Sequence, residues 1–178
     1  MKTQLIVLNG GSSSGKSSIV RCLQAVLPDS WLSLSVDTFV DALPASLQEG
    51  DAGIEFAPDG GVAVGGEFRR LEEAWIAGVV AMVRAGARVV VDEVFLGGAE
   101  SQARWLKAIG GDVEVLWVGV RCEAGVAAAR EADRGDRIGG MAAAQAELVH
   151  DGVSYDFEVD TARSGPRECA RLIAERAE

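Results

Sequence analysis

Eight residues near the N-terminus constrain the fold of this chain more than any other feature. They are Gly10, Gly11, Ser12, Ser13, Ser14, Gly15, Lys16 and Ser17. Their order matches G-x-x-x-x-G-K-[ST], and they stand between a short apolar run, Leu5–Leu8, and a segment with helical spacing of apolar residues, Ser17–Leu27. A glycine-rich turn between a strand and a helix directs successive backbone N–H groups toward a bound phosphate. The motif therefore predicts a sheet flanked by helices, with a phosphate-binding loop at its edge.

The last two residues of the motif complete this prediction. The ammonium group of Lys16 is expected to neutralise the β- and γ-phosphates of a nucleoside triphosphate, and the hydroxyl of Ser17 is expected to coordinate Mg²⁺. The alternative is a flexible turn followed by an incidental Lys-Ser pair. The motif occupies the first strand-to-helix connection, where a phosphate site belongs. We therefore predict ATP and Mg²⁺ as cofactors.

Further apolar runs predict a parallel sheet. Runs of strand length are Leu5–Leu8, Trp31–Val36, Arg88–Val91, Val113–Val120 and, more weakly, Tyr155–Val159. They are continuous rather than alternating, which is typical of strands buried on both faces. Segments that favour helices are Ser17–Leu27, Phe68–Arg84, Ser101–Ile109, Glu123–Arg134, Met141–Val149 and Arg167–Arg176. The alternation predicts a three-layer α/β fold with five parallel strands.

No internal repeat or low-complexity linker divides the sequence, so residues 1–178 are expected to form a single domain. Within it, Glu49–Gly66 is rich in glycine and contains the short alternating pieces Ile54–Phe56 and Val62–Val64. Such a pattern predicts a glycine-rich hairpin or flap.

Charge and cysteine content exclude several classes of function. Lys and Arg total 17 against 27 Asp and Glu, and the net charge of −10 disfavours binding to nucleic acids or anionic membranes. The three cysteines are widely spaced, which indicates reduced core thiols rather than disulfides or a zinc site. The first apolar run breaks at Asn9 and is too short for a signal peptide or a membrane span. We therefore expect a cytoplasmic protein.

Two aspartates end predicted strands. Asp37 follows Trp31–Val36, and at the carboxyl edge of a parallel sheet it would lie beside the phosphate loop as a candidate base. Because Asp is a favoured N-cap, capping of the next helix is the alternative. Asp92 closes the strand Val89–Val91 like a Walker B carboxylate, which holds Mg²⁺ or its waters. The adjacent Glu93 is the alternative carboxylate.

Arg130, Arg134 and Arg137 are spaced by four and three, so they would share one helix face. With the glycines that follow, residues 130–140 are predicted to form a lid in which Arg134 and Arg137 stabilise the transferring phosphoryl group. The alternative is a solvated face whose arginines pair with neighbouring acids. His150, the single histidine, is expected to act as a cation at the C-terminus of a helix.

The choice among nucleotide-binding functions favours a kinase. A guanine-specific Asn/Thr-Lys-x-Asp element does not follow Val113–Val120, where the chain reads Arg121-Cys122-Glu123-Ala124. Motor and transporter ATPases need further domains or partner surfaces that 178 residues scarcely supply. A compact kinase with its own acceptor pocket fits the sequence better.

These motifs also carry a family resemblance. The segments Leu8–Ser17, Val36–Thr38, Val91–Gly98 and Arg130–Gly140 resemble those of chloramphenicol phosphotransferase, along the whole chain. The resemblance implies a fold similar to adenylate and shikimate kinases, and ATP-dependent phosphorylation of the primary (3-) hydroxyl of chloramphenicol, which would confer antibiotic resistance. It also implies that Asp37 is the base and that Arg134 and Arg137 are lid cations.

The sequence departs conservatively from the family at Ser14, Thr38 and Glu93, where Ala, Ser and Asp are usual. These differences leave the phosphate machinery intact and bear on the acceptor. Another small hydroxylated metabolite is therefore an alternative substrate. A regulatory module that binds a nucleotide and transfers to no acceptor is the alternative of a different class.

Overall fold

The structure is a computed structural model that describes residues 2–48, 53–56, 62–134 and 140–178. Its elements are, in order, β1 (Leu5–Asn9), α1 (Lys16–Val26), β2 (Trp31–Ser35), α2 (Val36–Ala42), α3 (Ala45–Gln48), β3 (Ile54–Phe56), β4 (Val62–Val64), α4 (Gly66–Arg84), β5 (Arg88–Glu93), α5 (Ala99–Ile109), β6 (Val115–Arg121), α6 (Ala124–Arg134), α7 (Met141–Leu148), β7 (Phe157–Asp160) and α8 (Pro166–Ala177).

Five of the strands form one parallel sheet in the order β2-β5-β1-β6-β7. β1 is the central strand and pairs with β5 on one side and β6 on the other, and all five of its residues are buried. The pairing places Leu8 beside Asp92 and Asn9 beside Glu93. The predicted α/β fold with five parallel strands is confirmed, and the phosphate loop begins at the sheet edge where β5 ends.

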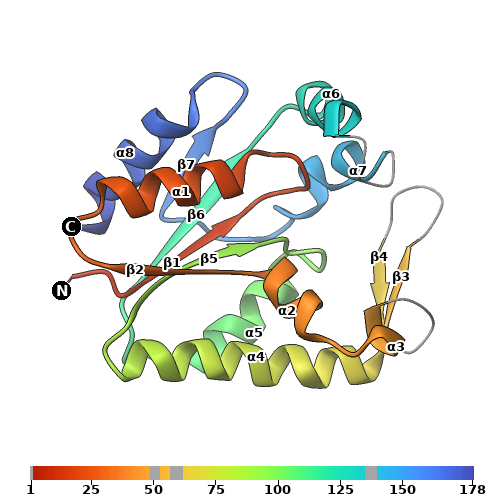
Figure 1. The fold of residues 1–178 in the computed structure, drawn as a ribbon, viewed down its shortest axis with the longest axis horizontal. Coiled ribbons are helices and arrows are strands. Elements are labelled where there is room, and N and C mark those ends of the chain that lie inside the picture. Colours follow the sequence, from red (N-terminus) through yellow and green to blue (C-terminus); the bar gives the residue numbers. More distant parts are fainter. Residues whose placement is uncertain (1, 49–52, 57–61, 135–139) are drawn as a thin grey trace.

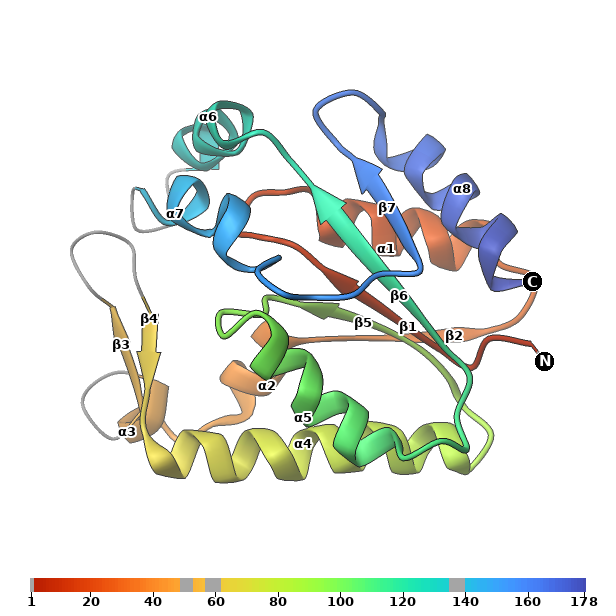
Figure 2. The same ribbon diagram turned by 180° about the vertical axis from the view of Figure 1, so that it is seen from behind.

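Two hydrophobic cores explain why the strands read as continuous apolar runs. Successive residues of β1 point to opposite faces, so Ile6 and Leu8 pack in one core while Leu5 and Val7 pack in the other. The first core lies under α1 and α8, and the second under α4 and α5 (Figures 1 and 2). The result is three layers, helices on both faces of the sheet. Both termini lie at the edge away from the phosphate loop (Figure 1).

A third, smaller core stands apart from the sheet. Its buried members come from α2, α3, β3, α4 and their connections, and they are Phe39, Leu43, Leu47, Ile54 and Phe68. β3 and β4 pair antiparallel over this core, at one end of the molecule in Figure 1. Gly53 is required at the base of the pair, because a Cβ there would lie 2.0 Å from the carbonyl oxygen of Leu47.

The described part of the predicted flap, Glu49–Gly66, is thus an antiparallel pair of strands. Residues 49–52 and 57–61 of that prediction lie outside the described residues. Of the helices in the described ranges, none has the length and apolar character needed to cross a membrane. All three cysteines are free; Cys122 and Cys169 are buried, and Cys22 is partly exposed.

The prediction for His150 is wrong. The ring is buried, 7% exposed, and its Nδ1 lies 2.6 Å from the hydroxyl of Tyr155. Burial lowers the pKa of His150 to about 4, and the charge of Arg121 adds to the shift. The imidazole is therefore neutral near pH 7 and belongs to a packed polar network rather than serving as a cation at a helix end.

Candidate active site

The phosphate loop, residues 10–17, is curled tightly against the sheet. Ser13 and Gly15 have positive φ angles of 56° and 91°, a conformation that turns the backbone back on itself. Gly10 packs closely on β6, since a Cβ at that position would lie 2.6 Å from the carbonyl oxygen of Val120. The loop backbone can therefore approach a ligand from a fixed position.

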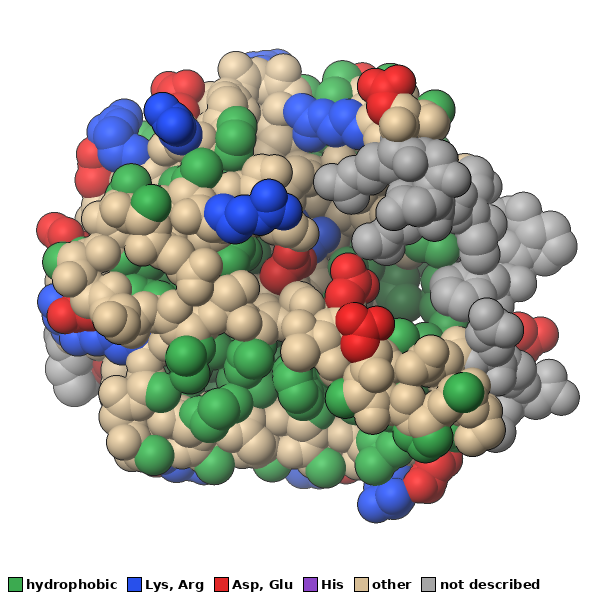
Figure 3. Space-filling view, in the orientation of Figure 1, with side chains coloured by type: hydrophobic (Ala, Val, Ile, Leu, Met, Phe, Trp, Pro, Cys, Tyr) green, Lys and Arg blue, Asp and Glu red, His purple; other side chains and the backbone are tan. Residues whose placement is uncertain are grey.

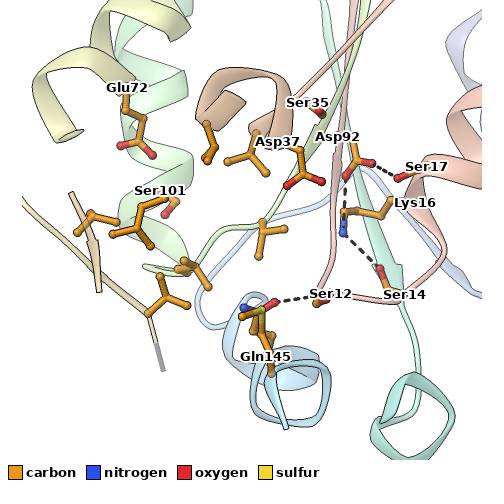
Figure 4. Close-up of a pocket in the computed structure, with 18 of the residues that line it drawn as sticks. Ser12, Ser14, Lys16, Ser17, Ser35, Asp37, Glu72, Asp92, Ser101 and Gln145 are labelled. Carbon is orange, nitrogen blue, oxygen red and sulfur yellow. Dashed lines mark hydrogen bonds and ion pairs between the residues drawn. The ribbon is translucent and has the colours of Figure 1, made fainter. Parts of the chain in front are cut away.

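Three predicted site residues meet where the loop enters α1. Lys16 is buried, and its Nζ donates to the carbonyl oxygens of Gly10 at 2.7 Å and Gly11 at 2.9 Å. The same nitrogen lies 3.6 Å from Oδ1 of Asp92. The Ser17 hydroxyl donates to Oδ2 of Asp92 at 3.0 Å (Figure 4). The lysine, the hydroxyl and the carboxylate thus form one connected cluster.

The geometry distinguishes Asp92 from its neighbour Glu93. Asp92 lines the cavity beside the loop and bonds to Ser17. Glu93 is also buried, but within the described residues its side chain forms no hydrogen bond with Ser17. Burial, with the nearby charges of Glu72 and Asp92, raises the pKa of Glu93 to about 8. Glu93 is therefore largely protonated at pH 7, which makes it the poorer candidate for a metal-linked carboxylate.

The loop also contains polar groups suited to an anion. The hydroxyl oxygens of Ser12 and Ser13 are buried and have no hydrogen-bond partner within the described residues. Leaving a buried hydroxyl without a partner costs about 1–3 kcal/mol. A phosphate chain lying along the loop would supply acceptors for both hydroxyls, so these residues fit the nucleotide that the motif predicts.

Asp37 lies in the first turn of α2 and lines the same cavity as the phosphate loop (Figure 4). The capping alternative for Asp37 is wrong. The N-cap is Ser35, whose side chain accepts a hydrogen bond from the backbone N–H of Thr38 at 3.0 Å. The helix begins at Val36, earlier than the sequence suggested, because a serine with extended backbone precedes it.

The main cavity has a volume of about 370 Å³ and one apolar side. We call this side the acceptor wall, and it consists of Val36 and Val40 from α2, Ile54, Val62 and Val64 from the strand pair, and Phe68 from α4. In the space-filling view of Figure 3, the molecular surface has a hollow with acidic side chains beside it and hydrophobic side chains within it. Figure 4 shows the loop and Asp37 on one side of the space and Glu72 and Ser101 on another.

The cavity ends in a cluster of charged and polar side chains. Glu72 pairs with Arg69 at 2.8 Å and with Arg104 at 3.1 Å. Arg104 also donates to the hydroxyl of Ser101 at 3.0 Å. Arg69, Glu72 and Ser101 all line the cavity. A ligand in this space would therefore meet the phosphate loop at one end, apolar side chains along its body and a polar cluster at the other end.

A second cavity, of about 380 Å³, lies on the other side of the loop. It is lined by Ser13, Gly15, Ser18, Arg130 and Asp133, together with residues 161 and 164–166. Arg130 donates to the hydroxyl and the carbonyl oxygen of Thr161 at 3.1 and 2.8 Å, and that hydroxyl donates to the carbonyl oxygen of Ser14 at 2.7 Å. Arg130 thus holds Thr161 in place, and Thr161 in turn bonds to the backbone of the phosphate loop.

The predicted lid cations remain predictions. Arg134 is the last residue of α6, where the structure describes the backbone position only, and Arg137 lies outside the described residues. Sequence reasoning did not single out Gln145, a buried residue of α7 that lines the main cavity beside the loop. Its helical spacing from Met141 and Ala142 indicates a buried face, but it gives no sign of contact with the phosphate loop.

A parallel sheet in this strand order, with a phosphate loop after its central strand and a cavity at its carboxyl edge, defines the class of P-loop kinases. Residues 3–178 match the pattern of the chloramphenicol phosphotransferase-like proteins, and the chain belongs to that family. A relative from Mycobacterium tuberculosis (strain H37Rv), provisionally named an O-phosphotransferase, is 30% identical over 193 aligned positions. The alignment covers 97% of this chain and 81% of that protein.

Solved structures agree on the fold. A sugar kinase from Janibacter sp. HTCC2649 superimposes with a TM-score of 0.66 and 16% identity, over 98% of this chain and 92% of that one. The shikimate kinase of Acinetobacter baumannii, solved with shikimate, gives a TM-score of 0.60 and 14% identity over the same shares. Family and fold together make this chain a nucleotide-binding, kinase-type O-phosphotransferase with a small-molecule substrate.

Proposed function

We propose that this protein transfers the γ-phosphoryl group of Mg²⁺-bound ATP to the primary (3-) hydroxyl of chloramphenicol. The observation that carries the proposal is that the phosphate loop and Asp37 line one cavity whose remaining wall is mainly apolar. A phosphoryl donor and an acceptor hydroxyl can meet there away from bulk water. Membership of the chloramphenicol phosphotransferase-like family supports chloramphenicol as the first candidate.

The nucleotide would lie across the loop. Its nucleoside would occupy the second cavity, beside Gly15 and Ser18, and its terminal phosphate would reach the main cavity. Mg²⁺ would neutralise part of the phosphate charge. It would be held by the hydroxyl of Ser17 and by Asp92, either directly or through bound water. Within the described residues no three His, Cys, Asp or Glu side chains gather into a metal site, so phosphate oxygens and water would complete the coordination.

The residues then divide the work of transfer. Asp37 takes or orients the proton of the acceptor hydroxyl as its oxygen bonds to the γ-phosphorus and the bond to ADP breaks. Lys16 and the loop N–H groups hold the phosphates in line. Arg134 and Arg137 are proposed to close over the site and to neutralise the charge that spreads over the transferring group.

The acceptor wall favours a molecule with an apolar body and a hydroxyl at one end, because six of the residues that line the cavity there are aliphatic or aromatic. The aromatic ring and primary hydroxyl of chloramphenicol meet this description. Another small hydroxylated metabolite of similar shape is the alternative acceptor. On either acceptor we propose a single domain acting in the cytoplasm, and on chloramphenicol a role in antibiotic resistance.

The test is direct. The protein is incubated with Mg²⁺-ATP and a panel of hydroxylated compounds headed by chloramphenicol, and the product masses are measured. We expect one phosphoryl group on chloramphenicol and none on an analogue that lacks the primary hydroxyl. If ATP binds but chloramphenicol stays unmodified while another compound gains a phosphoryl group, that compound replaces it as the acceptor.

A further inference from the structure

Gln145 holds the phosphate loop from the side of α7. Its amide oxygen, Oε1, accepts a hydrogen bond from the backbone N–H of Ser12 at 2.9 Å (Figure 4). The helix packs so closely on the loop that a Cβ at Gly11 would lie 3.2 Å from the Cβ and carbonyl carbon of Gln145. The glutamine is only 3% exposed. Gln145 is therefore positioned by the same backbone that is expected to bind phosphate.

Both ends of α7 are fixed, so this position is well determined. At its start, the carboxylate of Glu131 accepts hydrogen bonds from the backbone N–H groups of Gly140 and Ala142, each at 2.8 Å. At its end, the side chain of Asn9, the residue before the loop, donates to the carbonyl oxygen of Val149 at 2.7 Å. The strand that leads into the phosphate loop and the helix that carries Gln145 are thus joined directly.

The bond to Ser12 determines which end of the amide remains available. An N–H group needs an acceptor, so the oxygen of Gln145 must face Ser12 and the NH₂ group must face elsewhere. No described residue accepts a hydrogen bond from this NH₂ group, and the side chain lines the main cavity. A nearly buried donor that faces a cavity is suited to a ligand that brings an acceptor oxygen.

The two cavities indicate which part of a ligand that oxygen belongs to. The second cavity, where the nucleoside would lie, is lined by Ser13, Gly15 and Ser18 and does not include Gln145. Gln145 shares the main cavity with Asp37 and Asp92, two carboxylates that would repel a terminal phosphate. A neutral donor at this point adds attraction without changing the net charge of the site.

We propose that the amide nitrogen of Gln145 donates a hydrogen bond to the terminal phosphoryl group of bound ATP, so that Gln145 distinguishes ATP from ADP. The inference rests on the proposed nucleotide site and does not depend on the identity of the acceptor. When the γ-phosphoryl group has moved to the acceptor, the NH₂ group loses its partner on the nucleotide. The contact therefore favours binding of the substrate nucleotide over the product nucleotide.

The test compares the dissociation constants of ADP and a non-hydrolysable ATP analogue, measured by calorimetry with Mg²⁺ present. Gln145→Glu keeps an oxygen to accept from Ser12 and replaces the NH₂ donor with a negatively charged oxygen. Gln145→Ala removes both interactions. Gln102→Ala is the matched control, because Gln102 is also a buried glutamine that bonds backbone on both sides, to the N–H and carbonyl groups of Ser154, and it does not line the cavity.

We expect the wild-type protein and Gln102→Ala to share one preference for the ATP analogue over ADP. Gln145→Ala should reduce that preference by about tenfold, as expected for a hydrogen bond to a charged group, and Gln145→Glu by more. An unchanged preference in folded Gln145→Glu would overturn the inference, as would equal weakening of both nucleotides. A wild-type protein that binds neither nucleotide would overturn the nucleotide site itself, whereas failure of chloramphenicol as acceptor would leave the inference standing.

Discussion

One side of the main cavity is the phosphate loop, whose polar groups are held in place by hydrogen bonds. The other side is the acceptor wall, which consists of apolar side chains. The phosphate loop presents backbone groups, hydroxyls and Lys16, all connected to the ends of β1, β5 and β6. The acceptor wall presents aliphatic and aromatic side chains, of which Ile54 and Phe68 belong to the third core and Val40, Val62 and Val64 pack against it. The loop therefore depends on fixed polar geometry, while the wall depends on shape and burial.

This difference predicts how each side responds to substitution. Polar groups aimed at a transferring phosphoryl group act mainly in the transition state, so their loss lowers kcat. Apolar contacts are made about equally in the ground and transition states, so their loss raises KM for the acceptor. The predictions below test that division, from the largest expected effect to the smallest.

Lys16→Ala should lower turnover by roughly 10³ or more, because the ammonium group at the entrance of α1 is the main cation along the loop. Product formation and nucleotide affinity are measured on protein whose circular dichroism shows a folded state. Lys107→Ala, on the exposed face of α5, is the control and should turn over normally. Unchanged turnover in folded Lys16→Ala would contradict the nucleotide site.

Asp37→Asn should lower turnover by about 10², the lower end of the effect of general-base assistance, because phosphoryl transfer needs only modest deprotonation of the acceptor. ATP affinity should be preserved. Asp41→Asn, on the same helix, does not line the cavity and is the matched control. Near-normal transfer by Asp37→Asn would remove Asp37 as the base.

Asp92→Asn should lower turnover by about tenfold at low Mg²⁺ concentration, with partial recovery as Mg²⁺ is raised, because the amide still supplies one oxygen beside Ser17. Turnover is measured across a Mg²⁺ titration, with Asp37→Asn as the comparison that should not recover. If the loss of turnover in Asp92→Asn does not depend on the Mg²⁺ concentration, Asp92 acts on the acceptor rather than on the metal.

Val64→Thr should raise KM for the acceptor about three- to tenfold and leave kcat and the KM for ATP close to normal. Threonine keeps the shape and strand preference of valine but brings a hydroxyl to the apolar wall. Val26→Thr, at an exposed position of α1, controls for the chemical change. A fall in kcat as large as the rise in KM would contradict the prediction that the acceptor wall affects KM and the phosphate loop affects kcat.

The smallest expected effect concerns stability and the buried Glu93, the residue after Asp92. Its folded-state pKa of about 8 exceeds the model-compound value of 4.5, so the folded protein binds a proton more tightly than the unfolded chain. The stabilisation from this proton is fully present below pH 4.5 and is lost as pH rises toward 8. Glu93→Gln should reduce the fall of Tm between pH 5 and 8, whereas Glu73→Gln on the exposed face of α4 should not.

The sequence predicted the loop side well because its geometry is local. A strand, a glycine-rich turn and a helix are contiguous, and the predicted ends of β1 and α1 differ from the observed ends by a single residue. Asp92 could be placed because it lies near the carboxyl end of a strand that pairs with β1, although β5 continues past it to Glu93. The N-cap of α2 is Ser35 rather than Asp37, because helix boundaries are less reliably predicted from sequence than buried strands.

The acceptor wall and Gln145 could not be predicted in the same way. The wall combines α2, two short strands and the first turns of α4, and no fixed spacing connects these segments. Gln145 reaches Ser12 across 133 positions of sequence, through packing of α7 on the loop. The neighbours of His150 along the chain predict a cation at a helix end, whereas burial in the folded protein makes the imidazole neutral.

The third core has a consequence for how the substrate range of such a protein can change. Phe39, Leu43 and Leu47 lie behind the acceptor wall, Ile54 and Phe68 belong to both the wall and the third core, and none of the five belongs to the two cores that hold the sheet together. Trp75 packs against both this core and the second core, and substitutions at Val40, Val62 and Val64, which pack against the third core, leave most of the packing of the main cores unchanged. A laboratory selection for new acceptors could randomise Val40, Val62 and Val64 together and still recover mostly folded variants, because the sheet beneath the phosphate loop would not have to adapt.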